Sequence, residues 1–197
     1  MITIVLIHPG CTSFDIEQRI QGNLSVPLNR MGKDQIASLA NELKAKRPEV
    51  IYSPEMQPDW ECAQTLGSAL ETPVVAVSCL QNVNMGLWQG MEVEELHKYQ
   101  PTVYKEGKES PWNLRAPDGE TLQDAKKRVV SALKKISKKW DEDYCAAIVA
   151  SEPGAGLIRF VLKNGDCSNP DLWNLTRSQG TFELIEISKE DLSKIKE

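Results

Sequence analysis

The chain has 197 residues, of which 41% are hydrophobic and 26% charged, a balance typical of a globular domain with its own core. Its formal net charge of -5 argues against nucleic acid or an anionic membrane surface as the main partner. No apolar stretch approaches the roughly 20 residues that a bilayer span needs, so no membrane partner is expected.

The first elements combine a strand, a loop and a helix. Residues 2–7 are β-branched and aliphatic, as in a buried strand. Residues 8–31 show no convincing period, and a loop of this length inside a compact domain is usually functional. A helix is expected from Gly32 to the break at Pro48, with an apolar stripe on one face. The stripe consists of Ile36, Leu39, Ala40 and Leu43.

A second strand and helix follow the same order. Residues 50–52 read as a short buried strand. Asp59 can cap a helix that runs to about Leu70, because its side chain can accept from the first free N–H groups. Pro73 then breaks the chain before a strand at residues 74–77.

The middle of the chain, residues 79–119, is rich in Gly, Pro and Trp and predicts a loop-like excursion with a short helix at 92–99. Residues 118–140 contain the strongest helical pattern of the chain, with paired lysines on the solvated face. Its core stripe is Leu122, Ala125, Val129, Leu133 and Ile136.

The last part returns to strands. Residues 145–150 predict a buried strand, residues 157–163 a helix, and residues 181–188 alternate like an edge or antiparallel strand. Strands that alternate with helices predict an α/β fold, a three-layer sandwich with a mostly parallel central sheet and helices on both faces. We expect one domain over residues 1–197.

The cysteines and the start of the chain indicate the compartment. Five cysteines, an odd number without a C-x-x-C pair, fit a reducing interior better than a disulfide framework. Residues 2–7 are too short for a signal-peptide core and lack a basic leader. A cytoplasmic protein is therefore expected.

Three loops are candidates for a functional site. In open α/β sheets, ligands bind in the crevice beyond the carboxyl ends of the strands. The loops that start at His8, Ser53 and Ser151 follow three of the expected strands. A histidine at the mouth of a buried strand can be a nucleophile or a structural residue, and its neighbours must decide between these.

A series of short motifs occurs in a fixed order along these loops. They read IHPGCT at 7–12, RIQG at 19–22, PLNRMG at 27–32, YSP at 52–54, AQT at 63–65, LQNVNMGLWQG at 80–90, PDGETLQDAKKRV at 117–129 and ASEPGAGLIR at 150–159. In this order and spacing they resemble the histidine phosphatase superfamily, which has the phosphoglycerate mutase-like fold. The resemblance implies that fold for this chain.

The resemblance also implies which residues occupy the family's catalytic positions. The family uses a nucleophilic His, two Arg and a second His that hold the phosphate oxygens, and a carboxylic acid that protonates the leaving oxygen. His8 matches the nucleophile. The two Arg positions hold Ile7 and Glu61, the acid position holds Asn82, and the second His position holds Glu152.

These replacements remove the charges that the family's chemistry needs. Each Arg–phosphate hydrogen bond is worth about 1.5–3 kcal/mol, and an amide cannot donate a proton as a carboxylic acid does. The carboxylates of Glu61 and Glu152 would repel a phosphate. We therefore expect a pseudo-phosphatase without a cofactor, with a binding or regulatory role toward a small molecule or a protein.

Two alternatives remain open. The chain could be a divergent phosphomonoester phosphatase or phosphoglycerate mutase-like enzyme that uses His8 as phosphoryl acceptor. Replacement cations would then be needed, from Arg19, Arg30 or Arg115. Alternatively, Glu61 could be an ordinary residue on a helix surface, because extra residues before it blur the match.

The mouth of the pocket and its ligand complete the expectations. Arg19, Gln21 and Gly22 are predicted at the mouth. No metal is expected, since His8, Glu61 and Glu152 would need close geometry to bind a divalent transition metal. The same negative charge would suit an organic amine, while the simplest alternative is that these carboxylates face water or pair with Arg and Lys.

Overall fold

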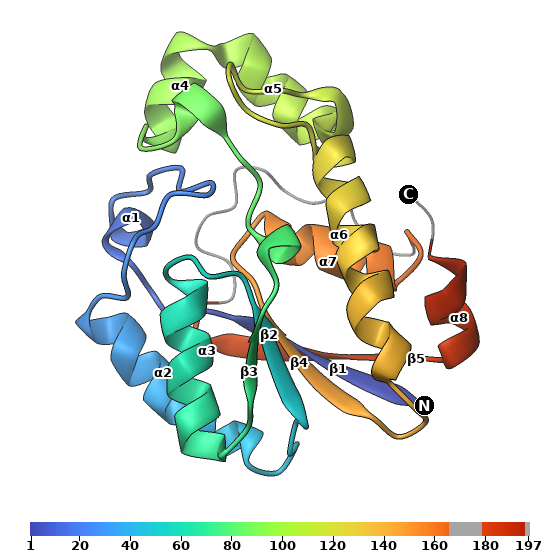
Figure 1. The fold of residues 1–197 in the computed structure, drawn as a ribbon. Helices are drawn as coiled ribbons and strands as arrows, with labels where there is room; N and C mark the ends of the chain where they lie inside the picture. The colour runs from blue at the N-terminus through green and yellow to red at the C-terminus, as the bar shows by residue number, and fades with distance from the viewer. Residues whose placement is uncertain (166–178, 196–197) are drawn as a thin grey trace.

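The computed structural model describes residues 1–165 and 179–195. Within them, five strands form one sheet in the order β3-β2-β4-β1-β5 (Figure 1). The strands are β1 (Ile2–His8), β2 (Val50–Ser53), β3 (Val74–Ala76), β4 (Cys145–Val149) and β5 (Thr181–Ile187). The pairs β3–β2, β2–β4 and β4–β1 are parallel, whereas β5 runs antiparallel to β1 at the edge of the sheet. The edge strand expected at residues 181–188 is therefore confirmed.

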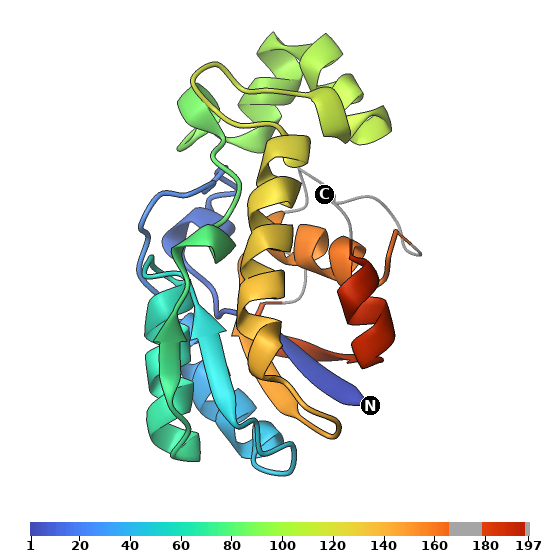
Figure 2. The same cartoon turned by 45° about the vertical axis from the view of Figure 1, so that its right-hand side comes forward.

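Helices cover both faces of this sheet (Figures 1 and 2). On one face lie α2 (Arg30–Leu43) and α3 (Asp59–Leu70), and on the other α6 (Leu122–Ile136) and α7 (Gly154–Leu162). The apolar stripes expected on α2 and α6 are buried in the two hydrophobic clusters that separate the layers. The three-layer α/β sandwich predicted from the sequence is confirmed.

The alternation of side chains along β1 decides where its last residue points. Val5 and Ile7 belong to the cluster under α2 and α3, whereas Ile4 and Leu6 belong to the cluster under α6 and α7. Successive side chains of a strand face opposite sides of the sheet. His8 therefore emerges on the side of α6 and α7, at the carboxyl end of β1.

The chain has more helix than the sequence indicates. The short helix expected at residues 92–99 is confirmed as α4 (Val93–Tyr99), but the segment also holds α5 (Pro101–Glu109), which was not expected. Both helices lie above the start of α6 (Figure 2). Pro101 fits the first turn of α5, because its missing N–H would have no partner there. Only Gly107 of α5 is buried, so the helix lacks the apolar stripe by which a sequence pattern is recognised.

Two short helices also lie outside the expected elements. α1 (Ser13–Ile16) lies inside the long loop after β1, and α8 (Lys189–Lys194) follows β5. α1 is held by a capping box between Thr12 and Asp15, a local device that produces no hydrophobic period.

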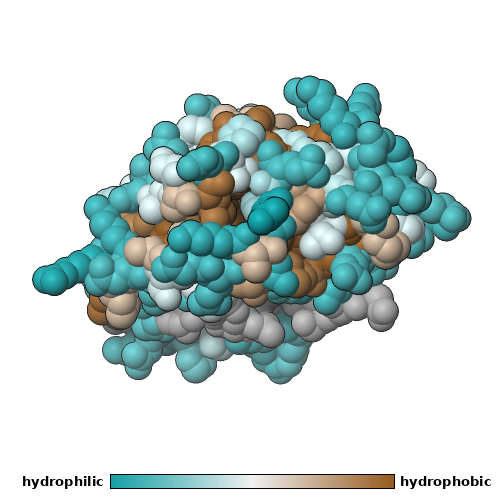
Figure 3. Space-filling model, turned by 90° about the horizontal axis from the view of Figure 1, so that it is seen from below, coloured by the Kyte–Doolittle hydropathy of each residue, from teal (hydrophilic) through white to brown (hydrophobic). Residues whose placement is uncertain are grey.

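Across residues 1–165 and 179–195, no helix is long and apolar enough to cross a bilayer. Figure 3 shows the end of the molecule opposite α4 and α5, where hydrophilic residues surround smaller hydrophobic patches.

Candidate functional site

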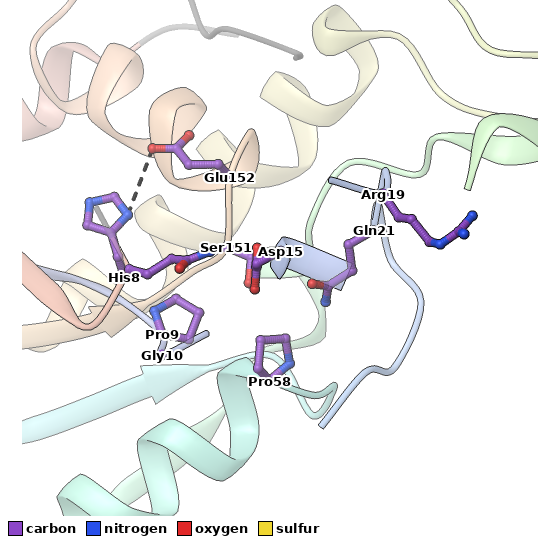
Figure 4. A pocket seen from close by; sticks show the side chains of 10 residues that line it. His8, Pro9, Gly10, Asp15, Arg19, Gln21, Pro58, Ser151 and Glu152 are labelled. Carbon is purple, nitrogen blue, oxygen red and sulfur yellow. Dashed lines mark ion pairs between the residues drawn. The ribbon is translucent and has the colours of Figure 1, made fainter. Parts of the chain in front are cut away.

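A pocket lies at the carboxyl ends of β1 and β4, in the place that the sheet topology predicts. Its cavity measures about 30 Å³, and the space is about 430 Å³ when the open solvent at its mouth is included. Its lining residues are His8, Pro9, Gly10, Asp15, Arg19, Gln21, Pro58, Ser151, Glu152 and Gln179 (Figure 4). The three loops expected to form the site all contribute to this lining.

His8 is the last residue of β1, and its side chain is only 4% exposed. Its Nε2 atom lies 3.5 Å from Oε1 of Glu183, and its Nδ1 atom lies 3.8 Å from Oε1 of Glu152. Nδ1 has no hydrogen-bond partner among the residues that the structure describes. The imidazole is therefore buried between two carboxylates.

Arg159 on α7 joins both carboxylates. Its Nε and Nη2 atoms each lie 2.6 Å from Oε1 of Glu183, and Nη2 lies 3.5 Å from Oε1 of Glu152. Burial alone would raise the pKa of Glu183, but the polar contacts with His8 and Arg159 outweigh it and hold this pKa at about 2. The guanidinium of Arg159, which shares both carboxylates with His8, is thus already neutralised by protein carboxylates.

The sequence interpretation missed Glu183. The residue lies on the same face of β5 as the buried Ile185 and Ile187, at the end nearest the site. A carboxylate at a core-facing position of an alternating strand is the signal that could have identified it.

Glu152 is fixed at the start of α7. Its Oε2 atom accepts a hydrogen bond of 2.9 Å from the backbone N–H of Gly156 in the first turn. The free N–H groups at a helix start favour a negative charge. The side chain is 10% exposed, so the carboxylate reaches the pocket from a largely dry position.

Asn82 lies behind the pocket lining and uses its whole amide. Nδ2 donates to the carbonyl oxygens of Gly22 and Glu152 at 2.9 and 2.8 Å. Oδ1 accepts from the backbone N–H groups of Val83 and Gly154 at 2.8 and 2.9 Å. Asn82 therefore positions the loops around the site, and it is not among the pocket-lining side chains.

Two other predicted pocket positions lie elsewhere. Glu61 accepts from the N–H of Leu28 and pairs with Nζ of Lys33, both at 3.1 Å. Ile7 is fully buried in the cluster under α2 and α3. Asp59 faces inward at the start of α3. Glu61 lies two residues further along the same helix, where the side-chain direction has turned by about 200°, so it faces away from the pocket.

The hypothetical metal set is not assembled. Within the described ranges, no three His, Cys, Asp or Glu side chains lie as a metal site requires. The set of His8, Glu61 and Glu152 fails because Glu61 is bound to Leu28 and Lys33.

Asp59 does not cap α3 as expected, since the capping position is Pro58. Its buried carboxylate instead accepts a hydrogen bond of 2.8 Å from Oγ of Ser151. Burial raises the pKa of Asp59 to about 7, although the hydrogen bonds from Ser151 act in the opposite direction. This contact ties the loop after β2 to the loop after β4.

The arginines proposed as replacement cations do not supply charge to His8. Arg19 lines the mouth, but its guanidinium binds Glu17, Glu92 and the carbonyl of Gly90 and points away from the pocket (Figure 4). Arg30 and Arg115 are exposed, and neither lines the pocket.

The remaining mouth residues differ in their roles. Gln21 lines the pocket, and its Nε2 atom donates to the carbonyls of Leu24 and Gln57, both at 3.2 Å. Gly22 does not line it. This residue has a φ of +58°, and a Cβ atom there would lie 2.2 Å from Oε1 of Gln89, so the position requires glycine.

Asp15 is a second lining carboxylate that the sequence interpretation missed. It accepts hydrogen bonds from the N–H and Oγ1 of Thr12 at 2.6 and 2.7 Å, as the acidic partner of a capping box. Burial raises its pKa above the usual value. The capping-box spacing can be read from the sequence, but it does not indicate that the side chain of Asp15 reaches a pocket.

The comparisons with known proteins agree with this architecture. The sequence model of the histidine phosphatase superfamily (branch 1) matches residues 4–193. Phosphoserine phosphatase 1 of Hydrogenobacter thermophilus is 27% identical over 143 residues, which are 72% of this chain and 68% of that protein. Phosphoglycerate mutase-like protein 4 of Arabidopsis thaliana is 30% identical over 139 residues, which are 69% of this chain and 60% of that protein.

Solved structures show the same fold. Bacillus stearothermophilus YhfR superposes with a TM-score of 0.83 at 22% identity and covers 96% of this chain and 93% of its own. Mycobacterial glucosyl-3-phosphoglycerate phosphatase, in a structure with VO3, has a TM-score of 0.81 at 20% identity and covers 93% and 92%. Because the family match spans nearly the whole chain, this protein belongs to the histidine phosphatase superfamily.

Proposed function

We propose that this protein is a pseudo-phosphatase, a cytoplasmic single-domain member of its family that binds a ligand or partner at the His8 pocket without transferring phosphoryl groups. One observation carries the proposal. The buried imidazole of His8 lies between the carboxylates of Glu152 and Glu183, and Arg159 is paired with both.

The charges around His8 oppose a phosphate. Two like unit charges 4 Å apart repel by about 4 kcal/mol at an effective dielectric constant of 20. Phosphoryl transfer depends almost entirely on positioning and on positive charge around the transferred group. Arg159 could supply that charge only by giving up its 2.6 Å contacts with Glu183.

The proton donor is missing as well. A leaving alkoxide must be protonated by a positioned acid within hydrogen-bond reach. Asn82 occupies the family's acid position, and both ends of its amide are bound to backbone groups. Asp59 is buried against Ser151 and does not line the pocket.

A second candidate function is a divergent phosphomonoester phosphatase or phosphoglycerate mutase-like enzyme that uses His8. The names of the curated relatives favour it, since they include a phosphoserine phosphatase and a phosphoglycerate mutase-like protein. The retained position of His8 at the end of β1 also favours it. This candidate requires Arg159 to leave Glu183 when the substrate enters.

Phosphate binding separates the two functions. We expect calorimetric titration of the protein with inorganic phosphate to give a Kd weaker than about 10 mM, because no free cation of the described site faces His8. His97→Asn is the matched control, since His97 stacks on Tyr104. Binding with a Kd below about 1 mM that His8→Asn abolishes and His97→Asn retains would overturn the proposal.

A further inference from the structure

Two polar atoms of the pocket face each other without a direct hydrogen bond. Nδ1 of His8 and Oε1 of Glu152 are 3.8 Å apart, which is beyond hydrogen-bond distance (Figure 4). Nδ1 is buried and has no hydrogen-bond partner among the described residues. Buried polar atoms are nearly always hydrogen-bonded, so a bound molecule that donates to Nδ1 would complete this site.

The second ring nitrogen indicates what that partner must offer. Nε2 lies 3.5 Å from the carboxylate of Glu183, which can accept a hydrogen bond from it. A neutral ring with its single proton on Nε2 presents the lone pair of Nδ1 toward the pocket, and this is the tautomer that a donating ligand would select. A ligand that satisfies Nδ1 and Glu152 together must therefore donate hydrogen bonds to both.

The charge of the lining indicates that the donor is positive. Asp15 and Glu152 both line the pocket, and the Arg19 guanidinium is turned outward to Glu17 and Glu92. Gln21 also lines the pocket, and because its Nε2 atom donates to carbonyl oxygens, its Oε1 atom is the acceptor that it can offer to a ligand. A group with several N–H donors and a positive charge matches this lining.

We propose that the pocket binds the ammonium group of a small organic amine, which donates hydrogen bonds to Nδ1 of His8 and Oε1 of Glu152. This inference rests on the proposed function, because it assigns a cationic ligand to a pocket that excludes phosphate. The unpartnered Nδ1 atom carries it, and the acidic lining supplies the charge.

Nitrogen NMR of the imidazole rings tests the proposal directly. The chain has 2 histidines, so ¹⁵N-imidazole labelling gives one reporter in the pocket and one on α4. We expect methylammonium to shift the Nδ1 resonance of His8 with a Kd below about 10 mM and to leave His97 unmoved. Tetramethylammonium has the same charge without an N–H donor, and we expect it to produce no comparable shift.

Two variants locate the binding site. Glu152→Gln keeps an oxygen for the N–H of Gly156 but removes the charge, and we expect it to weaken methylammonium binding at least tenfold. Glu61→Gln is the matched control, since its carboxylate is bound to Leu28 and Lys33, and it should bind like the wild type. Unchanged amide spectra in both variants would show that the fold is intact.

Several results would overturn the inference. These are equal shifts from methylammonium and tetramethylammonium, a His8 ring that carries protons on both nitrogens in the free protein at pH 7.5, and no shift up to about 10 mM amine. Failure of the inference differs from failure of the proposed function, which would appear as His8-dependent phosphate binding in place of amine binding.

Discussion

Nε2 of His8 lies 3.5 Å from Oε1 of Glu183, although the two residues come from opposite ends of the chain. They meet because β5 pairs antiparallel with β1, which places Glu183 opposite Leu6. The edge strand thereby brings a carboxylate to the imidazole, and Arg159 follows it from α7. The charge of the pocket depends on this strand as much as on the three loops.

Removal of the two carboxylates should restore anion binding. In the double variant Glu152→Gln and Glu183→Gln, Arg159 loses its charged partners and is free to pair with an anion. We expect the affinity for inorganic phosphate, measured by calorimetry, to rise at least tenfold over the wild type, or about 1.4 kcal/mol. Glu61→Gln with Glu42→Gln removes the same number of charges at positions that do not line the pocket, and a similar rise there would contradict the explanation.

Arg159 should be important for stability. Arg159→Met leaves Glu152 and Glu183 facing each other in a largely buried site, and removal of one partner from such a network costs about 3–5 kcal/mol. Urea denaturation should show that the free energy of unfolding falls by this amount. Adding Glu152→Gln and Glu183→Gln should recover most of it, whereas a triple variant as unstable as the single one would mean that the arginine acts through its packing.

Asp59 should make stability depend on pH. Its pKa of about 7 in the folded protein lies above the ordinary value of 3.8, so the folded state favours the protonated carboxyl. The stabilisation is complete below pH 3.8 and is lost as the pH rises to about 7, by at most about 4 kcal/mol.

The test compares Asp59→Asn with the wild type by chemical denaturation at several pH values. The variant cannot ionise, so we expect its stability relative to the wild type to increase from pH 4 to pH 7 and then to stay level. Asp118→Asn, at an exposed turn, is the control. Parallel curves for Asp59→Asn and the wild type would contradict the assignment.

Asn82→Asp should not create a working acid. The new carboxylate oxygen would face the carbonyl oxygens of Gly22 and Glu152, where Nδ2 now donates. The variant loses two hydrogen bonds and places a carboxylate oxygen against two carbonyl oxygens. We expect this to destabilise the protein by about 2–4 kcal/mol. Thermal unfolding measures this loss, and a variant as stable as the wild type that also hydrolysed phosphomonoesters would refute the positioning role.

The sequence patterns predicted the sheet and its main helices because those elements bury apolar faces. The stripe on α2 and the run of β1 are examples, and both lie in the core. α5 was missed because it buries only Gly107 and starts at Pro101. Where packing does not select a periodic face, the sequence has no hydrophobic signal to detect.

The site was predictable only as far as its loops. The ends of β1 and β4 placed His8 and Glu152 at one edge of the sheet, where the structure brings them within 3.8 Å. Glu61 shows the limit of this prediction. On a helix, a shift of two residues turns a side chain from the pocket to the surface, and the extra residues before Glu61 left its position on the helix undetermined from the sequence. Glu183 shows another, since its contact with His8 depends on the register between β1 and β5.

The most direct test of the central claim is a single comparison of turnover. Purified wild type and His8→Ala should be assayed with p-nitrophenyl phosphate and a panel of phosphosugars. We predict the same background rate for both proteins, because the charges around His8 do not stabilise a transferred phosphoryl group. Turnover at about 1 per second or faster that disappears in His8→Ala would contradict the account, since about 1 per second is the lower end of typical kcat values.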